Sequence, residues 1–417
     1  MRSNVESASR PLLGWAAAKL LAAVFVVSFY VGSAHRTVGH QKDFFSQWTL
    51  ARLAVEGRGS GIYDPKLQRE IAQKYVAPGK LDFRSDFYDR VGVSPYPPVM
   101  ALLYSPLGWL SPQTAQWCMV QLAVVLALVT AWAITTTTQG RIGSSTALLA
   151  VCCFPGFFYN VALGQNAAIT LALFALGWRS LASGKPISAG ATWGVLAYKV
   201  HWVVALGWLP FVLKKYRAYV GLALSVAMLV AAATLVFGPD VWAAWLVRVR
   251  AIAAFYGEQP VQLGMACDLR ATAHRYLPTP LAKPAGWGLL AIVGAISWWR
   301  FHRAKDRSAK SPAACVLLFG AGLIAPYMMY YDVTVFVLPL LLLWSYRAGM
   351  TRSQRSILTA LTIAFYASLP VMDHWPQRWQ GPPWATLAVL GLWGMSIWVA
   401  ATISRQSQTA TAASPAG

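Results

Sequence analysis

Long apolar runs recur along almost the whole chain, and they limit its fold more than any other feature of the sequence. Hydrophobic residues make up 57% of the chain and charged residues only 12%, whereas soluble domains carry about 25% charged residues. In lipid, every backbone N–H and C=O group needs a partner within the protein, and helices supply those partners locally. The pattern therefore predicts an all-α polytopic membrane protein.

Loops rich in Lys and Arg give the apolar runs an orientation, because such loops stay in the cytoplasm. Four of them, at 179–185, 214–217, 300–310 and 347–355, lie on one side with both termini if the chain crosses the membrane about twelve times. The predicted spans are 12–33, 115–138, 145–160, 164–180, 187–200, 201–213, 217–237, 286–300, 312–326, 331–346, 355–371 and 382–403. Several are shorter than the roughly 20 residues that a bilayer requires. This indicates either paired pieces of broken helices or boundaries displaced by several residues.

Two long segments then lie on the outer side of the membrane, at 34–114 and 238–285. Both belong to a single transmembrane domain, 1–403, which is followed by a predicted disordered cytoplasmic tail at 404–417. The first segment contains half of the 14 acidic residues of the chain, namely Asp43, Glu56, Asp64, Glu70, Asp82, Asp86 and Asp89.

The first outer segment is predicted to lie along the membrane surface. Residues 45–57, "FSQWTLARLAVEG", can form an amphipathic helix with Phe45 and Trp48 near one face and Arg52 turned away. Together with Phe44, these two rings would anchor the segment at the height of the lipid phosphates. The stretch "YPPVMALLYSPLGWLSP" at 96–112 has Pro near both ends and is too short to cross. We expect it to lie on the outer leaflet or dip into it.

Several function classes lose support from the composition. The net charge of +21 does not indicate nucleic-acid binding, because cytoplasmic loops of polytopic proteins collect Lys and Arg. The five cysteines show neither metal-ligand spacing nor a disulfide framework. The sequence has no Walker-type glycine loop, GxSxG elbow or HExxH motif, which argues against nucleotide-driven chemistry and against serine or zinc hydrolysis. No cofactor is predicted.

Polar residues interrupt the apolar runs at four places that this orientation puts on the outer side. They are Asp43, "GQN" at 164–166, "YKVHW" at 198–202 and "PYMMYYD" at 326–332. Within a membrane, the backbone leaves helical geometry only where protein or water satisfies it. Four such junctions on one side predict a single polar cavity that faces outward.

The charged residues at two junctions have both structural and functional interpretations. Asp43 is either the N-cap of the helix that follows or a general base close to the lipid headgroups, and the two roles are compatible. Lys199 and His201 lie inside an apolar stretch, where ionisable side chains usually line a cavity. There they would suit an anionic phosphate; a lysine that snorkels to the interface is the alternative.

The other junctions leave similar alternatives. Asp332 can pair with Lys199, bind a divalent metal, or cap the span that follows. Tyr330 and Tyr331 are either interfacial anchors or rings that stack on a sugar.

The remaining one of the four junctions is neutral. Gln165 and Asn166 can hold sugar hydroxyls there, although Asn166 can equally be a helix cap. A fifth outer junction contains Asp373 and His374, which lie close to Trp375 and Trp379 and are interpreted as part of an interfacial aromatic belt.

Taken in order, these motifs resemble the bacterial glycosyltransferase family 87. The family consists of membrane glycosyltransferases of the C superfamily and includes polyprenol-phosphate-mannose-dependent α-1,2-mannosyltransferases. The resemblance runs from residue 40 to residue 345. It rests on Asp43 after the first span, "YPPVMALLYSPLGWLSP", "LGQNAAITLALFALGW", "SAGATWGVLAYKVHWVVALGWLPFVLKKYR" and "PYMMYYDVTVFVLPLLLLW".

The resemblance implies many transmembrane helices with periplasmic juxtamembrane helices, a glycosyltransferase C-type fold. It also implies a sugar donor on a polyprenyl phosphate and inversion at the anomeric carbon. A carboxylate of the first outer loop serves as the general base in this family, and the matching residue is Asp43. Some members use a His in the late outer loop, where this chain has Tyr330, Tyr331 and Asp332. That departure raises the interest of Lys199 and His201.

The sequence thus predicts a multi-pass enzyme of the bacterial inner membrane whose site faces the periplasm. It would transfer a hexose, with mannose as the expected sugar, from a polyprenyl-phosphate donor to a glycolipid or glycan acceptor. The resemblance does not require a metal. Asp43 would be the base, Lys199 and His201 would bind the donor phosphate, and the sugar and acceptor would contact Gln165, Asn166, Tyr96, Tyr331 and Asp332. The alternative class is a transporter or flippase of lipid-linked glycans, against which the lack of internal repeats argues.

Overall fold

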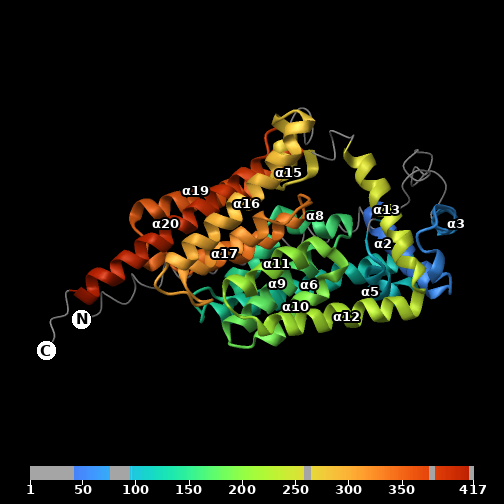
Figure 1. Cartoon of the computed structure of the whole chain (residues 1–417), viewed down its shortest axis with the longest axis horizontal. Coiled ribbons are helices and arrows are strands. Elements are labelled where there is room, and N and C mark those ends of the chain that lie inside the picture. The colour runs from blue at the N-terminus through green and yellow to red at the C-terminus, as the bar shows by residue number, and fades with distance from the viewer. Residues whose placement is uncertain (1–41, 76–93, 95, 258–263, 375–380, 413–417) are drawn as a thin grey trace, which may run out of the picture.

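The computed structural model describes residues 42–75, 94, 96–257, 264–374 and 381–412 (Figure 1). In these ranges the regular secondary structure is helical, with one isolated bridge between Ala266 and Met329 and no strand. The predicted all-α class is therefore confirmed for the described part of the chain. The predicted first span, 12–33, lies outside it.

Among the described residues, six helical segments are long and apolar enough to cross a membrane, and a pair of helices bent by 61° could form a seventh span. The six are α6 (Pro112–Thr137), Pro186–Val212, α12 (Arg217–Phe237), α16 (Thr279–Arg303), α19 (Arg352–Asp373) and Trp384–Gln406 within α20 (Trp384–Ala412). The bent pair is α7 (Ser144–Cys152) and α8 (Pro155–Leu163). The part of the chain that the structure describes therefore does not show the predicted twelve full-length spans.

Shorter helices fill the remaining segments. Four apolar ones are α5 (Pro98–Gly108), α9 (Ala167–Ala182), α17 (Pro312–Leu323) and Asp332–Trp344, which joins η3 (Asp332–Phe336) to α18 (Val337–Trp344). The outer segments of the predicted topology also hold α2 (Lys42–Val55), η1 (Gly59–Gly61), α3 (Pro65–Tyr75), α13 (Asp240–Gly257) and α15 (Leu269–Tyr276). A last 3-10 turn is η4 (Arg347–Gly349).

The segment Pro186–Val212 is not one straight span. It contains α10 (Pro186–Gly194), η2 (Val195–Lys199) and α11 (Val200–Val212). A Cβ atom added to Gly190 would lie 1.7 Å from the carbonyl oxygen of Ala218, so α10 is in backbone contact with the start of α12. A straight helix would put Val212 roughly 33 Å from Gly190. The six-residue step from Val212 to Ala218 reaches at most about 21 Å, so the segment must fold back on itself.

The fold-back places a buried lysine at its turn. Lys199 leaves helical geometry, with φ −131° and ψ 78°, between η2 and α11. The predicted division between 187–200 and 201–213 agrees with this turn. Because small residues let backbones approach closely, Gly190 and Gly221 allow the contact between α10 and α12 on which the fold-back rests.

Helix α2 lies inside the protein, against α5, at one end of the molecule (Figure 1). A Cβ atom at Gly108 would lie 2.4 Å from the carbonyl oxygen of Ala51, so the two backbones touch. Phe44, Phe45 and Trp48 are at most 5% exposed. The prediction that these rings anchor a surface helix in lipid is therefore wrong, because α5 and its neighbours cover them.

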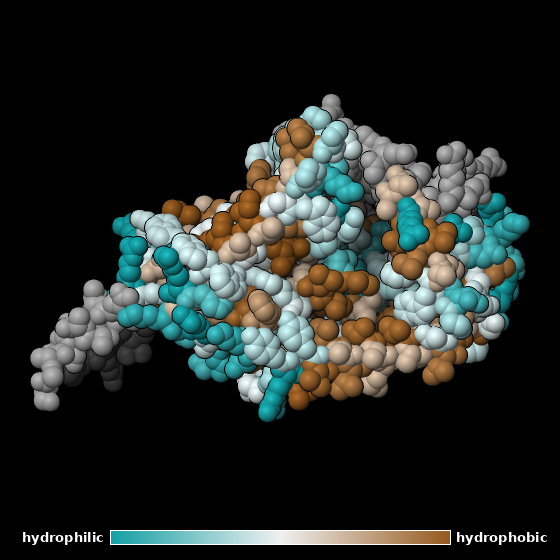
Figure 2. All heavy atoms as spheres, viewed as in Figure 1, coloured by the Kyte–Doolittle hydropathy of each residue, from teal (hydrophilic) through white to brown (hydrophobic). Residues whose placement is uncertain are grey.

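The outer surface has the pattern of a membrane protein. Exposed apolar side chains follow α12, among them Leu224, Met228 and Leu235. Figure 2 shows apolar side chains over the middle of this face and hydrophilic ones toward both ends.

Near the C-terminus, α20 continues to Ala412. The predicted disordered tail thus begins inside a helix, since extending a helix costs less than starting one.

Candidate active site

A left-handed glycine brings the first and second polar junctions together. Gly164 ends α8 with φ 62°, a conformation that costs glycine little because it has no Cβ. A Cβ atom at Gly164 would also lie 2.5 Å from the Cβ of Phe44. Glycine therefore lets α2 approach the break between α8 and α9, which places Gln165 against Asp43.

The Gln165 amide connects Asp43 to two further side chains. Its Nε2 donates to Asp43 Oδ2 at 3.0 Å, and its Oε1 accepts from the Tyr96 hydroxyl at 3.1 Å and from Gln47 Nε2 at 3.2 Å. Gln47 is fully buried and Gln165 nearly so. An ionised carboxylate only accepts hydrogen bonds, so Asp43 fixes which end of the amide faces it.

The structure bears on the two interpretations of Asp43, an N-cap of the following helix and a general base. It lies in the first turn of α2, one residue after the helix begins at Lys42, and its carboxylate bonds Gln165. Burial raises the pKa of this carboxyl above its ordinary value, and the hydrogen bond from Gln165 offsets part of that rise. Asp43 is still partly exposed. A carboxylate with a raised pKa that substrate can reach is typical of a general base.

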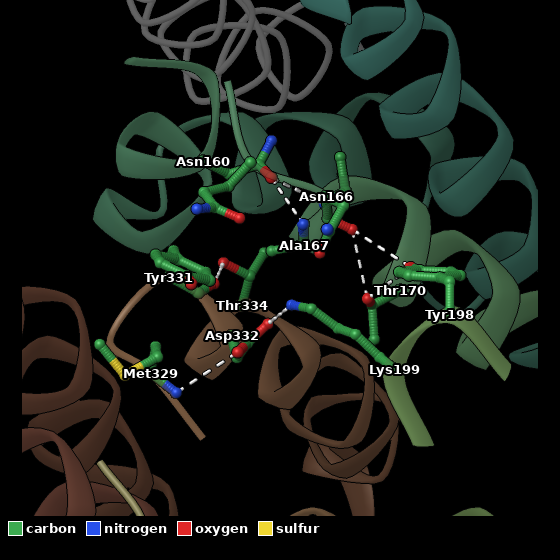
Figure 3. A network of polar contacts seen from close by, with 12 residues as sticks. Asn160, Asn166, Ala167, Thr170, Tyr198, Lys199, Met329, Tyr331, Asp332 and Thr334 are labelled. Carbon is green, nitrogen blue, oxygen red and sulfur yellow. Dashed lines mark hydrogen bonds and ion pairs between the residues drawn. The ribbon is translucent and has the colours of Figure 1, made fainter. Parts of the chain in front are cut away.

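The N-terminus of α9 is capped by a residue that the sequence analysis missed. Asn160 Oδ1 accepts from the amides of Ala167 and Ala168 at 2.6 and 3.3 Å (Figure 3). Asn166 occupies the N-cap position but makes no side-chain cap bond. The capping interpretation of Asn166 is therefore wrong, and its amide is available for another role.

Lys199 and Asp332 form a buried ion pair. The ammonium Nζ and carboxylate Oδ1 are 2.6 Å apart, and the two side chains are 4% and 2% exposed. Figure 3 shows them pointing at one another, with Asp332 Oδ2 also accepting from the Met329 amide at 3.3 Å. Of the three roles considered for Asp332, pairing with Lys199 is the one that the structure shows. Lys199 does not snorkel to the surface.

The tyrosines of the late junction are buried rather than interfacial. Tyr330 and Tyr331 are each 8% exposed and meet edge to face, with ring centroids 5.2 Å apart. Tyr331 also lies 5.3 Å below the Lys199 ammonium, and Tyr330 meets Tyr159. The Tyr159 hydroxyl donates to Asp373 at 2.8 Å.

His201 is the second residue of the returning helix α11. Its ring packs against Trp202, and its Nε2 is buried without a hydrogen-bond partner in the described chain. Among all the described residues, no three His, Cys, Asp or Glu side chains gather in a way that would hold a metal ion.

Of the predicted aromatic belt near Asp373 and His374, Trp375 and Trp379 lie outside the described residues.

A chain of contacts links all four predicted junctions. Asp43 bonds Gln165, the Tyr198 hydroxyl lies 2.9 Å from Thr170 at the start of α9, and Lys199 beside Tyr198 pairs with Asp332. The Tyr96 hydroxyl bonds the same Gln165 amide as Asp43, and the Tyr331 ring lies against the Lys199 ammonium that pairs with Asp332. The residues missed from sequence are Gln47, Asn160 and Thr170, each an ordinary polar residue inside a helix.

These features define a membrane protein with a partly exposed carboxylate of raised pKa and a buried ion pair, both at breaks between short helices. Residues 95–326 match the model of glycosyltransferase family 87. The chain belongs to this family, and the protein is a glycosyltransferase. The match includes Tyr96, Gln165, Asn166, Lys199 and His201, and it ends before Tyr331 and Asp332 and begins after Asp43. No match was found among curated proteins or among solved structures.

Proposed function

We propose that this glycosyltransferase moves a sugar from a polyprenyl-phosphate donor to a glycolipid or cell-envelope glycan, and that the sugar is mannose. The reaction would take place at the periplasmic face of a bacterial inner membrane. The observation that carries the proposal is the Asp43 carboxylate, which is partly exposed, has a raised pKa and bonds one neutral amide. It lies among polar residues of a membrane glycosyltransferase, where an acceptor hydroxyl needs a base.

Asp43 accepts the proton of the attacking hydroxyl in this proposal. The acceptor oxygen forms a bond to the anomeric carbon while the bond from that carbon to the donor phosphate oxygen breaks. The phosphate leaves with the electron pair as polyprenyl phosphate. A single displacement inverts the anomeric centre and needs one carboxylate, whereas retention uses two about 5 Å apart. Asp332, the other carboxylate of the site, is occupied by Lys199.

Lys199 and His201 are the proposed contacts of the donor phosphate. The buried Nε2 of His201 has no partner in the described chain and can donate to a phosphate oxygen. Lys199 would meet the phosphate while Asp332 holds it, so the ammonium is oriented before substrate arrives. Charge on the leaving phosphate is stabilised by donors that are already in place.

We place four side chains in the lining of the sugar and acceptor site: Tyr96, Asn166, Tyr331 and Asp332. Tyr331 offers a ring face next to a cation, and Asn166 offers a fully buried amide. Sugars present hydroxyl groups and apolar C–H faces, which suit amides and aromatic rings respectively.

Purified protein in detergent, given polyprenyl-phosphate-mannose and candidate glycolipid acceptors, tests the proposal. We expect sugar transfer by the wild type and by Asp306→Asn, a matched control in an exposed loop, and none by Asp43→Asn. Transfer that survives Asp43→Asn would reject the base assignment. No transfer, with the lipid-linked sugar crossing a vesicle bilayer instead, would favour a transporter.

The proposed orientation has a separate test. Asp64 lies in an exposed position after η1, on the outer side of the predicted topology. A cysteine at position 64, in a background without the native cysteines, should react with an impermeant maleimide added to whole cells with a permeabilised outer membrane. Protection until the inner membrane is opened would overturn the orientation.

A further inference from the structure

We propose that Gln165 is a positioning residue that orients the Asp43 carboxylate, and that it is not a ligand of the sugar. This inference rests on the proposed function of Asp43 as the base, and it changes the role first predicted for Gln165. It follows from the hydrogen bonds of a single amide and from the backbone that holds it.

The Gln165 side chain has little bonding capacity left for a substrate. A glutamine amide offers two N–H donors and two oxygen lone pairs. Tyr96 and Gln47 occupy both lone pairs of Oε1, and Asp43 occupies one donor of Nε2. Only one N–H group remains. A residue that recognised sugar hydroxyls would keep more of these groups open.

The amide is held from both sides. Gln47 comes from the same helix as Asp43, one turn further on, so α2 supplies both the carboxylate and a support for its partner. Gln165 directly follows the left-handed Gly164, which is packed against Phe44. A side chain bonded at both ends of its amide and attached to a constrained backbone has few rotamers to adopt.

This arrangement assigns different tasks to the two oxygens of Asp43. Oδ2 accepts from Gln165, while Oδ1 accepts no hydrogen bond within the described residues. Because the amide fixes Oδ2, it also fixes the direction of Oδ1, which is the atom left to receive the proton. The amide stabilises the ionised form as well, and the carboxylate must be ionised to act as a base.

The neighbouring amide provides a contrast within one dipeptide. Asn166 is fully buried, does not cap α9, and has no well-aligned hydrogen bond to Nδ2 or Oδ1 in the described chain, although it lies close to the Tyr96 hydroxyl. Buried amide groups without partners are costly, which is consistent with a ligand that satisfies them. Gln165 therefore serves Asp43, and Asn166 is left for the substrate.

The test compares Gln165→Met with Gln354→Met in the full-length protein. Gln354 is an equally buried glutamine with two side-chain hydrogen bonds, at the far end of α19. Infrared difference spectra across a pH titration would report the Asp43 carboxyl, assigned by its loss in Asp43→Asn. This measurement needs no activity. Steady-state transfer kinetics across the same pH range would then separate kcat from the donor KM.

We expect Gln165→Met to move the Asp43 titration and the acidic limb of kcat/KM to higher pH. We also expect kcat to fall on the order of tenfold or more, with the donor KM unchanged within a factor of about two. Gln354→Met should change neither titration nor kinetics. An unchanged Asp43 titration would overturn the inference. So would a raised donor KM with an unchanged acidic limb, because that is the result for a sugar ligand.

A second variant covers the case in which Gln165→Met does not fold. Gln165→Asn keeps an amide but is one methylene shorter, so it is expected to lose its reach to Asp43 and to move the titration in the same direction. If the wild-type protein transfers sugar to none of the acceptors, the proposed function fails. The infrared titration still decides whether Gln165 acts on Asp43.

Discussion

The two carboxylates of the site, Asp43 and Asp332, are the same residue type in opposite surroundings. Asp43 is partly exposed and bonded to a neutral amide. Asp332 is 1% exposed and lies 2.6 Å from an ammonium. A neighbouring cation favours the ionised form and makes a carboxylate a poorer proton acceptor, whereas burial beside neutral groups has the opposite effect. Under the proposed mechanism, the partner of each carboxylate therefore determines its task.

The cost of each arrangement also differs. A buried ion pair recovers through its attraction what its two charges lose in leaving water, but only while both are present. A single partly buried carboxylate has no such compensation, and its raised pKa records the cost. We therefore expect mutations of the Asp332–Lys199 pair to lower stability as well as activity, and mutations of Asp43 to lower mainly the rate of catalysis.

The largest expected effect is the loss of transfer in Asp43→Asn. General bases contribute about 10²–10⁴-fold to rate, so kcat should fall by that factor while the protein folds normally. Because burial raises the pKa of Asp43 in the folded state, ionisation costs stability as the pH rises through that pKa. The neutral variant should therefore have a Tm at pH 7 no lower than the wild type.

Wild-type transfer should show the matching pH dependence. The base acts in its ionised form, so kcat/KM should decline on the acidic side, at a pH above the ordinary range of an aspartate. A flat acidic limb, or a clear fall in Tm for Asp43→Asn, would remove the contrast between the two carboxylates.

The next effect is on the stability of the ion pair. Lys199→Met leaves Asp332 buried and unpaired, which should lower the free energy of unfolding by about 3–5 kcal/mol. The double variant Lys199→Met/Asp332→Leu should recover most of that loss, since apolar residues of similar volume replace buried pairs at little cost. Reversible unfolding in mixed micelles would measure both. A double variant as unstable as the single one would mean that the pair is more than charge compensation.

Sequence patterns predicted much of this site because they depend on local rules. Polar residues within apolar runs indicated the breaks, and the breaks at Gln165 and Lys199 are where the helices end or turn. Side-chain partners were harder to predict. Nothing near Asn160 in the sequence distinguishes a cap that acts seven residues later from a polar residue that faces a neighbouring helix.

The prediction that the segment of α2 lies on the membrane surface was wrong for a related reason. Aromatic residues at a predicted membrane edge suit lipid and protein interior equally well, so Phe44, Phe45 and Trp48 were compatible with both. The deciding contact is with α5, where Gly108 meets Ala51 more than fifty residues away in the chain. Long-range packing of that kind has no local signature.

A smaller effect is expected at Asn160, which caps α9 next to Gln165, the partner of Asp43. Asn160→Ala removes the acceptor for two amides at the start of α9 and should cost about 1–2 kcal/mol. Because α9 begins directly after Gln165 and Asn166, kcat should fall as well. Ser111→Ala, which removes the cap of α6, is the matched control. It should lower stability and leave kcat unchanged; equal kinetic effects in both variants would contradict the link.

The smallest effect distinguishes a helix held by protein from one held by lipid. The Trp48 indole donates to the carbonyl oxygens of Leu107 and Leu110, each at 3.2 Å. Trp48→Phe should therefore lower the unfolding free energy by about 1 kcal/mol. That loss should be the same in detergent and in lipid nanodiscs, whereas Trp109→Phe, at a site 72% exposed, should change little in detergent. If the Trp48 loss appeared only in lipid, α2 would be anchored by the membrane, and Asp43 would owe its position to the bilayer instead of to α5.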